Sequence, residues 1–331
     1  MNWEEFVPSR LAVFASALLI FAAAAAVAQA QDLPNKPIHM VIAFPPGGPT
    51  DFVGRLVADK VKDILGQPVI IENKPGANGA IGADYVAKSA PDGTTLFLTT
   101  LGAVGVTPHM RTDIRYDTIK DFAPITLVVL NTTLIVVKAE SPFNSMKDLT
   151  AAAKAKPGEM TFATTGVGAN THLTLELYQG AAGVKFVHIP YRGAAPALTD
   201  LLGGQVQVFA ADAPVLMPHI KGGKIKALGA ASGRRNPMLP DVPTLAEQGY
   251  ADTTVDNWYG LLAPAGTPPA VISKIHDAFV AAINDPAIKE KLVQSGAIPV
   301  ANSPAEFGKF LKEEYDRWGK VVREKGIKDA S

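Results

Sequence analysis

The spacing of apolar residues changes near residue 50, and this change marks the first structural unit. Residues 38–44 form a short, nearly continuous apolar run, which is typical of a strand buried on both faces of a parallel sheet. The segment Pro45-Pro46-Gly47-Gly48-Pro49 ends this run. From Asp51 onward the apolar positions lie on one helical stripe: Phe52, Val53, Leu56, Val57, Val61, Ile64 and Leu65. The pattern therefore predicts a strand, a glycine-rich loop and a helix.

The next segments repeat this alternation of strand and helix. Apolar runs at residues 67–72 and 94–100 flank a helical pattern over residues 80–90. Together with the first unit they give a βαβαβ order, which predicts an α/β fold with a doubly wound parallel sheet.

A second α/β unit opens with the same pattern. An apolar strand at residues 160–164 leads through the glycine-rich segment 165–170 into a helix that begins at Thr171. A strand at residues 256–262 has the composition of a crossing strand that returns to the first unit.

These patterns predict two doubly wound α/β domains. We expect the first domain to be discontinuous, with residues 31–131 and 252–331, and the second to cover residues 132–251.

The C-terminal segment carries three helix-start signals. A capping residue followed by proline occurs at residues 267–268, 285–286 and 303–304, and each pair predicts an N-cap and a first helical position. Glu306 completes a capping box with Ser303.

Composition and charge then narrow the class of protein. The chain has 331 residues, of which 47% are hydrophobic and 19% charged, and this is an ordinary globular composition that fits two domains. Its formal net charge is zero, so a nucleic-acid partner is not expected. The chain has no cysteine, which excludes disulfides, a thiol nucleophile and a cysteine-linked lipid anchor.

The N-terminus has the pattern of an export signal. Arg10 precedes an Ala-rich apolar run at residues 11–27, and the sequence Ala28-Gln29-Ala30 follows it. We expect a signal peptide over residues 1–30, cleaved near Ala30, and a mature protein in the periplasm. The alternative is a single transmembrane anchor, although the run is near the lower length limit for spanning a bilayer.

Common enzyme signatures are absent from the sequence. It has no G-x-S-x-G elbow, no H-E-x-x-H motif and no Walker A motif. The six histidines are scattered, without a pair at helical spacing, so neither a metal site nor a cofactor is expected. No catalytic residue is assigned.

The two glycine-rich loops are the strongest candidates for a binding site. Each precedes a helix, so free backbone N–H groups and the positive end of the helix dipole form a seat for an anion. The alternative at the first loop is a tight turn in which Thr50 or Asp51 caps the helix. In open α/β sheets ligands bind at the carboxyl ends of strands, so two units face to face would bring both loops to one cleft.

One helix end alone cannot supply the binding free energy of such a site, so many hydrogen-bond donors are needed. One helix end contributes about 0.3–1 kcal/mol to an exposed charge and up to ~2 kcal/mol to a partly buried one. Micromolar affinity needs about −8 kcal/mol. We therefore expect hydroxyl donors to act together with the loops: Thr50, Thr100, Thr165 and Thr171.

Four charged or titratable residues near the loops have two interpretations each. Asp51 either caps a helix or accepts a hydrogen bond from an ammonium, a hydroxyl or a water. His172 either donates to a carboxylate or is a half-buried structural residue. Asp212 either lines the cleft, which we favour, or caps the following helix. Arg192 either pairs with a ligand carboxylate or, as we favour, is solvated.

Several long segments, in order, resemble one family. They are FPPGGPTD (44–51), ENKPGANGAIGADYVAKSAPDGTTL (72–96), TTGVGANTHL (164–173), VHIPYRGAAPALTDLLGGQV (187–206), HIKGGKIKALG (219–229), DVPTLAEQGY (241–250) and WYGLLAPAGTP (258–268). With these segments the chain resembles the extracytoplasmic solute-binding proteins of tripartite tricarboxylate transporters, the Bug or TctC-like family.

The resemblance implies a periplasmic-binding-protein-like fold of type II, with a ligand cleft between two α/β domains. It implies a small carboxylate ligand held by the two glycine loops, and membrane transporter subunits as partners. Carried over to this chain, the loop residues are Phe44, Gly47, Gly48, Asp51, Gly166, Gly168, Asn170, Thr171 and His172. With Thr100 and Asp212 these are the expected ligand-binding residues. The chain departs from the usual family pattern at Gly54 and in the segment FAADAP that contains Asp212.

The function expected from these observations is capture of a small carboxylate by a monomeric periplasmic protein and its delivery to a transporter. Two alternatives stand beside it. One is a ligand-binding sensory adaptor for a membrane receptor kinase, and the other is an enzyme on the same scaffold.

Overall fold

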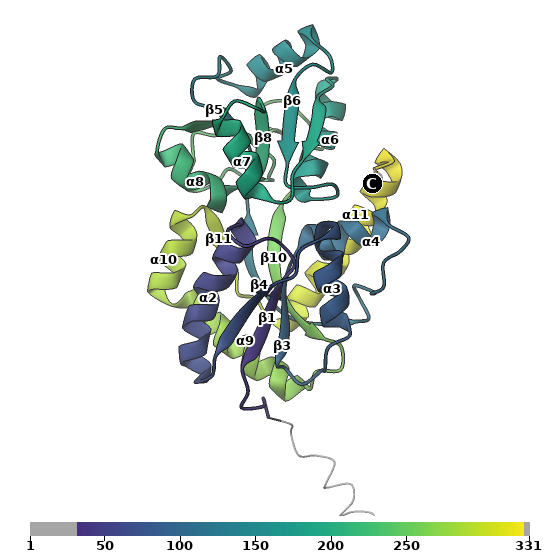
Figure 1. The fold of residues 1–331 in the computed structure, drawn as a ribbon, viewed down its shortest axis with the longest axis vertical. Coiled ribbons are helices and arrows are strands. Elements are labelled where there is room, and N and C mark those ends of the chain that lie inside the picture. Colours follow the sequence, from purple (N-terminus) through teal and green to yellow (C-terminus); the bar gives the residue numbers. More distant parts are fainter. Residues whose placement is uncertain (1–31, 328–331) are drawn as a thin grey trace, which may run out of the picture.

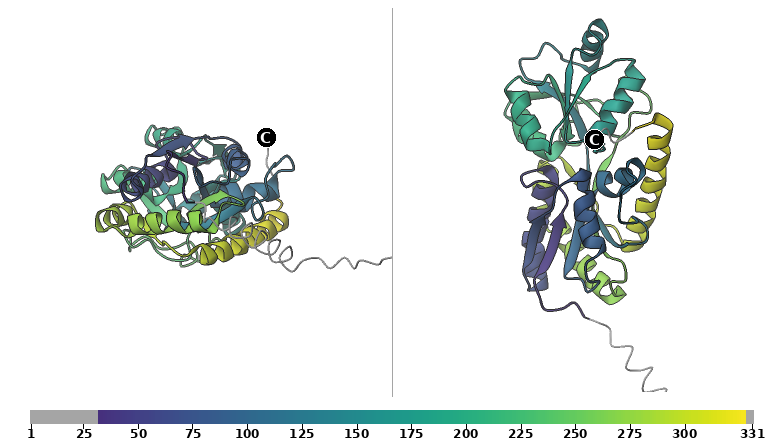
Figure 2. Two further views of the ribbon diagram at one scale, coloured as in Figure 1. Left: turned by 90° about the horizontal axis from the view of Figure 1, so that it is seen from below. Right: turned by 45° about the vertical axis from the view of Figure 1, so that its right-hand side comes forward.

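The computed structural model describes residues 32–327, so the expected signal peptide lies outside the described residues. Two β-sheets, each flanked by helices, lie one above the other along the long axis of the molecule (Figures 1 and 2). This mixed α/β architecture agrees with the expected fold class.

The first sheet has six strands in the order β11-β4-β10-β3-β1-β2. Its strands are β1 (Ile38–Ile42), β2 (Val69–Asn73), β3 (Thr95–Thr100), β4 (Phe122–Asn131), β10 (Asn257–Pro264) and β11 (Ala297–Pro299). The predicted βαβαβ unit forms the parallel part, β2-β1-β3. The expectation of a parallel sheet fails beyond it, because β10 runs antiparallel to both β3 and β4.

Helices cover both faces of the first sheet. They are α2 (Pro49–Leu65), α3 (Ala80–Ala87), α4 (Thr107–Met110), α9 (Pro269–Asn284), α10 (Pro286–Gln294) and α11 (Pro304–Lys325), with a 3-10 turn η1 (Ala77–Gly79) and a π-helical turn η2 (Gly102–Val106). Strand β1 is buried on both sides, as its apolar run predicts: Met40 packs in the core cluster with Val57 of α2, and Val41 in the cluster with Phe307 of α11.

The second sheet has five strands in the order β7-β6-β8-β5-β9. Its strands are β5 (Thr133–Lys138), β6 (Thr161–Thr164), β7 (Val187–Pro190), β8 (Val208–Asp212) and β9 (Ile225–Ala230), and its helices are α5 (Met146–Ala155), α6 (Asn170–Ala182), α7 (Ala194–Leu202) and α8 (Ala213–Lys221). Strands β7, β6 and β8 are parallel, whereas β5 is antiparallel to β8 and to β9.

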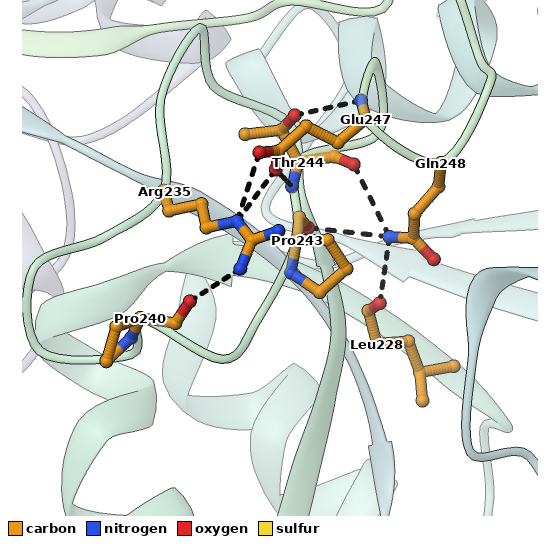
Figure 3. Close-up of polar contacts among 7 residues, drawn as sticks. All are labelled: Leu228, Arg235, Pro240, Pro243, Thr244, Glu247 and Gln248. Carbon is orange, nitrogen blue, oxygen red and sulfur yellow. Dashed lines mark hydrogen bonds and ion pairs between the residues drawn. The ribbon is translucent and has the colours of Figure 1, made fainter.

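The chain crosses between the sheets near the middle of the molecule. It leaves the first sheet at Thr132, between β4 and β5, and returns through residues 231–256 to β10. Polar contacts brace this returning segment (Figure 3): Arg235 Nε binds Glu247 Oε2 at 2.9 Å, and Gln248 Nε2 donates to the carbonyl of Leu228 at 3.1 Å. A segment without long helices or strands therefore holds a fixed path between the two sheets.

Two of the three predicted helix starts in the C-terminal segment are confirmed. Asp285 caps α10, and Ser303 with Glu306 forms the capping box of α11. The pair at residues 267–268 is wrong by one position: α9 begins at Pro269, and the Thr267 hydroxyl donates to the carbonyl of Pro264 at 2.8 Å instead of capping a helix.

Candidate functional site

A cavity of about 110 Å³, here called the inner pocket, lies between the two sheets. Helices α2, α6 and α7 begin at its wall, through Thr50, Asn170 and Ala194 respectively. The remaining lining residues are Phe44, Pro45, Pro46, Gly48, Pro49, Asn78, Thr100, Gly102, Thr165, Ala169, Thr171, Arg192, Gly193, Ala195, Pro196, Asp212 and Asn257. Helix N-termini offer backbone N–H groups and positive dipole ends, so this arrangement suits an anion.

A larger cavity of about 620 Å³, here called the outer chamber, shares a wall with the inner pocket. Both cavities are lined by Phe44, Pro45, Asn78, Thr165, Arg192 and Gly193. Much of the remaining lining is apolar, with Ala43, Pro75, Val167, Met110 and Pro190, and Arg111 adds a second guanidinium. The outer chamber can therefore accommodate the body of a ligand whose charged end occupies the inner pocket.

Backbone from the second unit approaches side chains of the first unit across these cavities so closely that a side chain would crowd them. A Cβ placed on Gly193 would lie 3.3 Å from Pro45 Cγ, and one placed on Gly168 would lie 3.1 Å from Asn78 Nδ2. Both glycines have positive φ angles, +102° and +77°, which side chains rarely adopt. The walls meet because these positions carry no side chain.

The first glycine loop is held in place by hydrogen bonds to the buried carboxylate of Asp51. Helix α2 is capped by Gly48, with Pro49 as its first residue, so the alternative of Thr50 or Asp51 as N-cap is wrong. The Asp51 carboxylate is 5% exposed and accepts hydrogen bonds from the Gly47 backbone N–H at 3.0 Å and from Asn73 Nδ2 at 2.9 Å. Burial opposes its charge, but hydrogen bonds from Arg55, Gly47 and Asn73 hold the pKa of Asp51 below its ordinary value.

The second glycine loop is held in a similar way by its own helix. Thr171 Oγ1 accepts a hydrogen bond from the Thr165 backbone N–H at 3.0 Å, and His172 Nδ1 accepts one from the Gly168 N–H at 3.1 Å. The His172 ring stacks on His188 with 4.5 Å between ring centroids. His172 therefore supports the loop from behind.

Asp212 lies at the base of the inner pocket, where the two sheets meet. Its Oδ1 accepts from Thr133 Oγ1 at 3.1 Å and Asn170 Nδ2 at 2.9 Å. Its Oδ2 accepts from Asn257 Nδ2 at 2.6 Å and the Tyr259 hydroxyl at 2.7 Å. Burial raises the pKa of Asp212 above its ordinary value, while these four donors act in the opposite direction. The side chain makes no capping bond to α8, although Asp212 occupies its N-cap position.

The expected ligand-binding residues divide into three groups by position. Those at the inner pocket are Phe44, Gly48, Thr100, Asn170, Thr171 and Asp212. Gly166 and Gly168 line the outer chamber. Gly47, Asp51 and His172 line neither cavity: Gly47 is an exposed residue of the first loop, whereas Asp51 and His172 are buried behind the loops.

Sequence reasoning missed part of the lining. Asn78 lines both cavities and is fixed by a hydrogen bond from its Nδ2 to Thr107 Oγ1 at 3.0 Å. Gly193 and Ala194 repeat the pattern of strand, glycine and helix start for a third time, and this signal could have revealed them. Asn257 gave no such signal, because it joins the pocket only through the return of β10 to the first sheet.

The described residues contain neither a metal-binding cluster nor a membrane-spanning helix. Between residues 32 and 327 no three His, Asp or Glu side chains are grouped as a metal site would require. Over the same residues no helix combines the length and hydropathy needed to cross a membrane.

Comparison with known proteins gives one consistent family. Residues 53–327 match the family described as "Tripartite tricarboxylate transporter family receptor". Protein BugT of Bordetella pertussis is 37% identical over 321 residues, which cover 97% of this chain and 98% of BugT.

Two solved structures of similar fold contain a ligand. Rpa4515 of R. palustris with adipate is 31% identical, with a TM-score of 0.86 over 90% of this chain and 99% of the other. MatC of Rhodopseudomonas palustris with bound malate is 32% identical, with a TM-score of 0.82 over 87% and 99%.

Proposed function

The chain belongs to the tripartite tricarboxylate transporter receptor family, a family of solute-binding proteins, and from this premise we propose how it works. It captures a small carboxylate-bearing metabolite between its two α/β units and delivers it to the membrane subunits of a transporter. The observation that carries the proposal is the convergence of α2, α6 and α7 on one pocket, whose lining also includes the exposed Arg192. Adipate and malate, the ligands of the two similar structures, are both carboxylates.

The residues of the cleft have different roles in binding the ligand. The N–H groups at the starts of the three helices receive a ligand carboxylate, with hydroxyls of Thr50, Thr100 and Thr171 beside them. Arg192, which is exposed to solvent and lines the pocket, supplies a full positive charge. The close approach of Gly193 to Pro45 limits the access of water and so strengthens these interactions.

The biological setting follows from the same proposal. The chain is exported by its N-terminal signal, cleaved near Ala30, and acts in the periplasm as a monomer without catalysing a reaction. Family membership favours transport over a sensory adaptor and over an enzyme on the same scaffold.

Calorimetric titration with mono-, di- and tricarboxylates tests the proposal, with product analysis of each bound mixture. At least one carboxylate should bind without turnover, whereas the corresponding amides should not. Arg192→Gln should weaken binding about tenfold or more, because a hydrogen bond to a charged group is worth about 1.5–3 kcal/mol. Arg235→Gln, a control on the returning segment that breaks the ion pair with Glu247, should leave affinity unchanged. Product formation, or equal affinity in both variants, would contradict the proposal.

A further inference from the structure

Two asparagines of the inner pocket are turned the same way by one carboxylate. Asn170 comes from the second unit and Asn257 from β10 of the first sheet, and both line the pocket. Each donates its side-chain Nδ2 to Asp212, Asn170 to Oδ1 at 2.9 Å and Asn257 to Oδ2 at 2.6 Å.

The contacts of Asp212 fix this orientation. Both of its oxygens accept hydrogen bonds from their neighbours, so an amide that turned its oxygen toward Asp212 would place one acceptor against another. The other two neighbours, the hydroxyls of Thr133 and Tyr259, also donate. No Lys, Arg or His side chain of the described residues pairs with Asp212, so its hydrogen-bond partners are neutral groups.

The consequence is that both amide oxygens lack a donor. Asn257 Oδ1 is buried and has no hydrogen-bond partner. Asn170 Oδ1 accepts no hydrogen bond from the described residues, and its side chain lines the pocket. Because Asn257 Oδ1 is fully buried, Asn170 Oδ1 is the acceptor that a ligand in the pocket can reach, and a ligand that supplies a donor to it gains affinity.

We propose that the ligand is a carboxylate with a hydrogen-bond donor, a hydroxyl or an ammonium, on the carbon next to the carboxylate, and that Asp212 is the positioning residue that sets this preference. The inference rests on the proposed carboxylate-binding function. Asn170 is the first residue of α6, one of the three helix starts that would receive the carboxylate, and its side chain lines the same pocket. A donor on the carbon next to the carboxylate therefore lies near Asn170 Oδ1.

Matched ligand triples test the preference on the unmodified mature protein. Each triple keeps one carbon skeleton: propanoate, lactate and alanine; succinate, malate and aspartate; glutarate, 2-hydroxyglutarate and glutamate. In at least one triple the hydroxyl or amino member should bind about fivefold tighter or more than the plain acid, as expected for one added hydrogen bond. Comparison of the two donor-bearing members distinguishes a hydroxyl from an ammonium.

The outcomes separate this inference from the proposed function. If plain acids bind as tightly as their donor-bearing partners in every triple, the inference is overturned and carboxylate binding stands. If no carboxylate in these triples or in the broader screen binds, the proposed function itself fails and this inference fails with it.

A variant tests the role of Asp212 directly. Asp212→Asn replaces two acceptor atoms by one acceptor and one donor, so one neighbouring asparagine is expected to turn its amide over and offer an N–H to the pocket. The affinities of a donor-bearing ligand and of the plain acid should then differ by no more than about twofold. Glu314→Gln is the control for the loss of a buried carboxylate, because Glu314 lies away from the cleft and accepts from the indole N–H groups of Trp258 and Trp318 and from Arg317. If Asp212→Asn keeps the same preference, the positioning role of Asp212 is overturned. If this variant does not fold, titration of the unmodified protein with the matched ligands still decides the ligand class.

Discussion

The Asp51 carboxylate holds the first glycine loop against strand β2, so Asp51→Ala should loosen the loop rather than remove a ligand contact. Its two oxygens accept from Gly47 N–H and from Asn73 Nδ2, and the side chain is nearly fully buried. Asn73 Nδ2 also donates to the carbonyl of Phe44 at 3.0 Å, so the loss extends to the start of the loop. Arg55 adds an ion pair at 2.9 Å, but its own side chain is 52% exposed.

The expected magnitude follows from these contacts. A hydrogen bond to a charged group is worth about 1.5–3 kcal/mol, whereas an exposed ion pair contributes about 0–1 kcal/mol. Part of the loss is recovered when water reaches the freed donors, so we expect unfolding to become easier by about 2–4 kcal/mol. This corresponds to a fall in Tm of roughly 3–6 °C, because the entropy of unfolding is about 2.1 cal/mol/K per residue. Loss of a helix cap alone would cost about 1 kcal/mol.

Denaturant unfolding and calorimetric titration distinguish the two roles of Asp51. Asp59→Ala is a control on the same helix, because Asp59 is 74% exposed and pairs only with exposed Lys62, and it should change stability by less than about 0.5 kcal/mol. Asp51→Ala should lower the affinity for every carboxylate by a similar factor, since all ligands bind against the same loop. Stability equal to that of the control, together with a changed ranking among carboxylates, would refute this reasoning and make Asp51 a ligand contact.

Two further predictions concern closure and pH. Gly168→Ala should weaken the binding of all carboxylates about tenfold, because a methyl group at this positive-φ position adds about 1–2 kcal/mol of backbone strain and presses on the opposite wall. Gly180 lies on the following helix with free space around it, so Gly180→Ala should leave the affinity unchanged. Equal affinities in the two variants would exclude a role of Gly168 in closure. Burial lowers the pKa of His109 and of His188, so the unfolded chain takes up protons first and the free energy of unfolding should fall as pH drops below about 6.5. Thermal melts from about pH 8 to about pH 5 measure this, and a Tm that rises on acidification would contradict it.

Local patterns in the sequence were sufficient to predict the two glycine loops and the helices behind them. A change in hydrophobic period identifies β1 and α2, and a proline in the first helical turn fits the observed start of α2. The role of Asp51 was not accessible in this way. It depends on Asn73, which the parallel register of β1 and β2 places opposite Ile42.

The contacts of Asp212 illustrate the same limit more strongly. Its partners Thr133, Asn170 and Asn257 lie 79, 42 and 45 residues away in the chain. Each residue type is common at strand and helix ends, so no spacing marks them as a group. Only the return of the chain to the first sheet brings Asn257 and Tyr259 to a carboxylate of the second.

The position of Asp212 relative to the two crossings has a consequence for ligand binding. Thr133 follows the first crossing at Thr132, and Asn257 follows the second, so the Asp212 contacts lie close to the pivot about which the two units would rotate. Displacement in a hinge motion grows with distance from the pivot, so opening would separate Pro45 from Gly193 while leaving the Asp212 contacts in place. The amides of the inner pocket would then be oriented before a ligand arrives, and a ligand with a matching donor would bind without the cost of reorienting them.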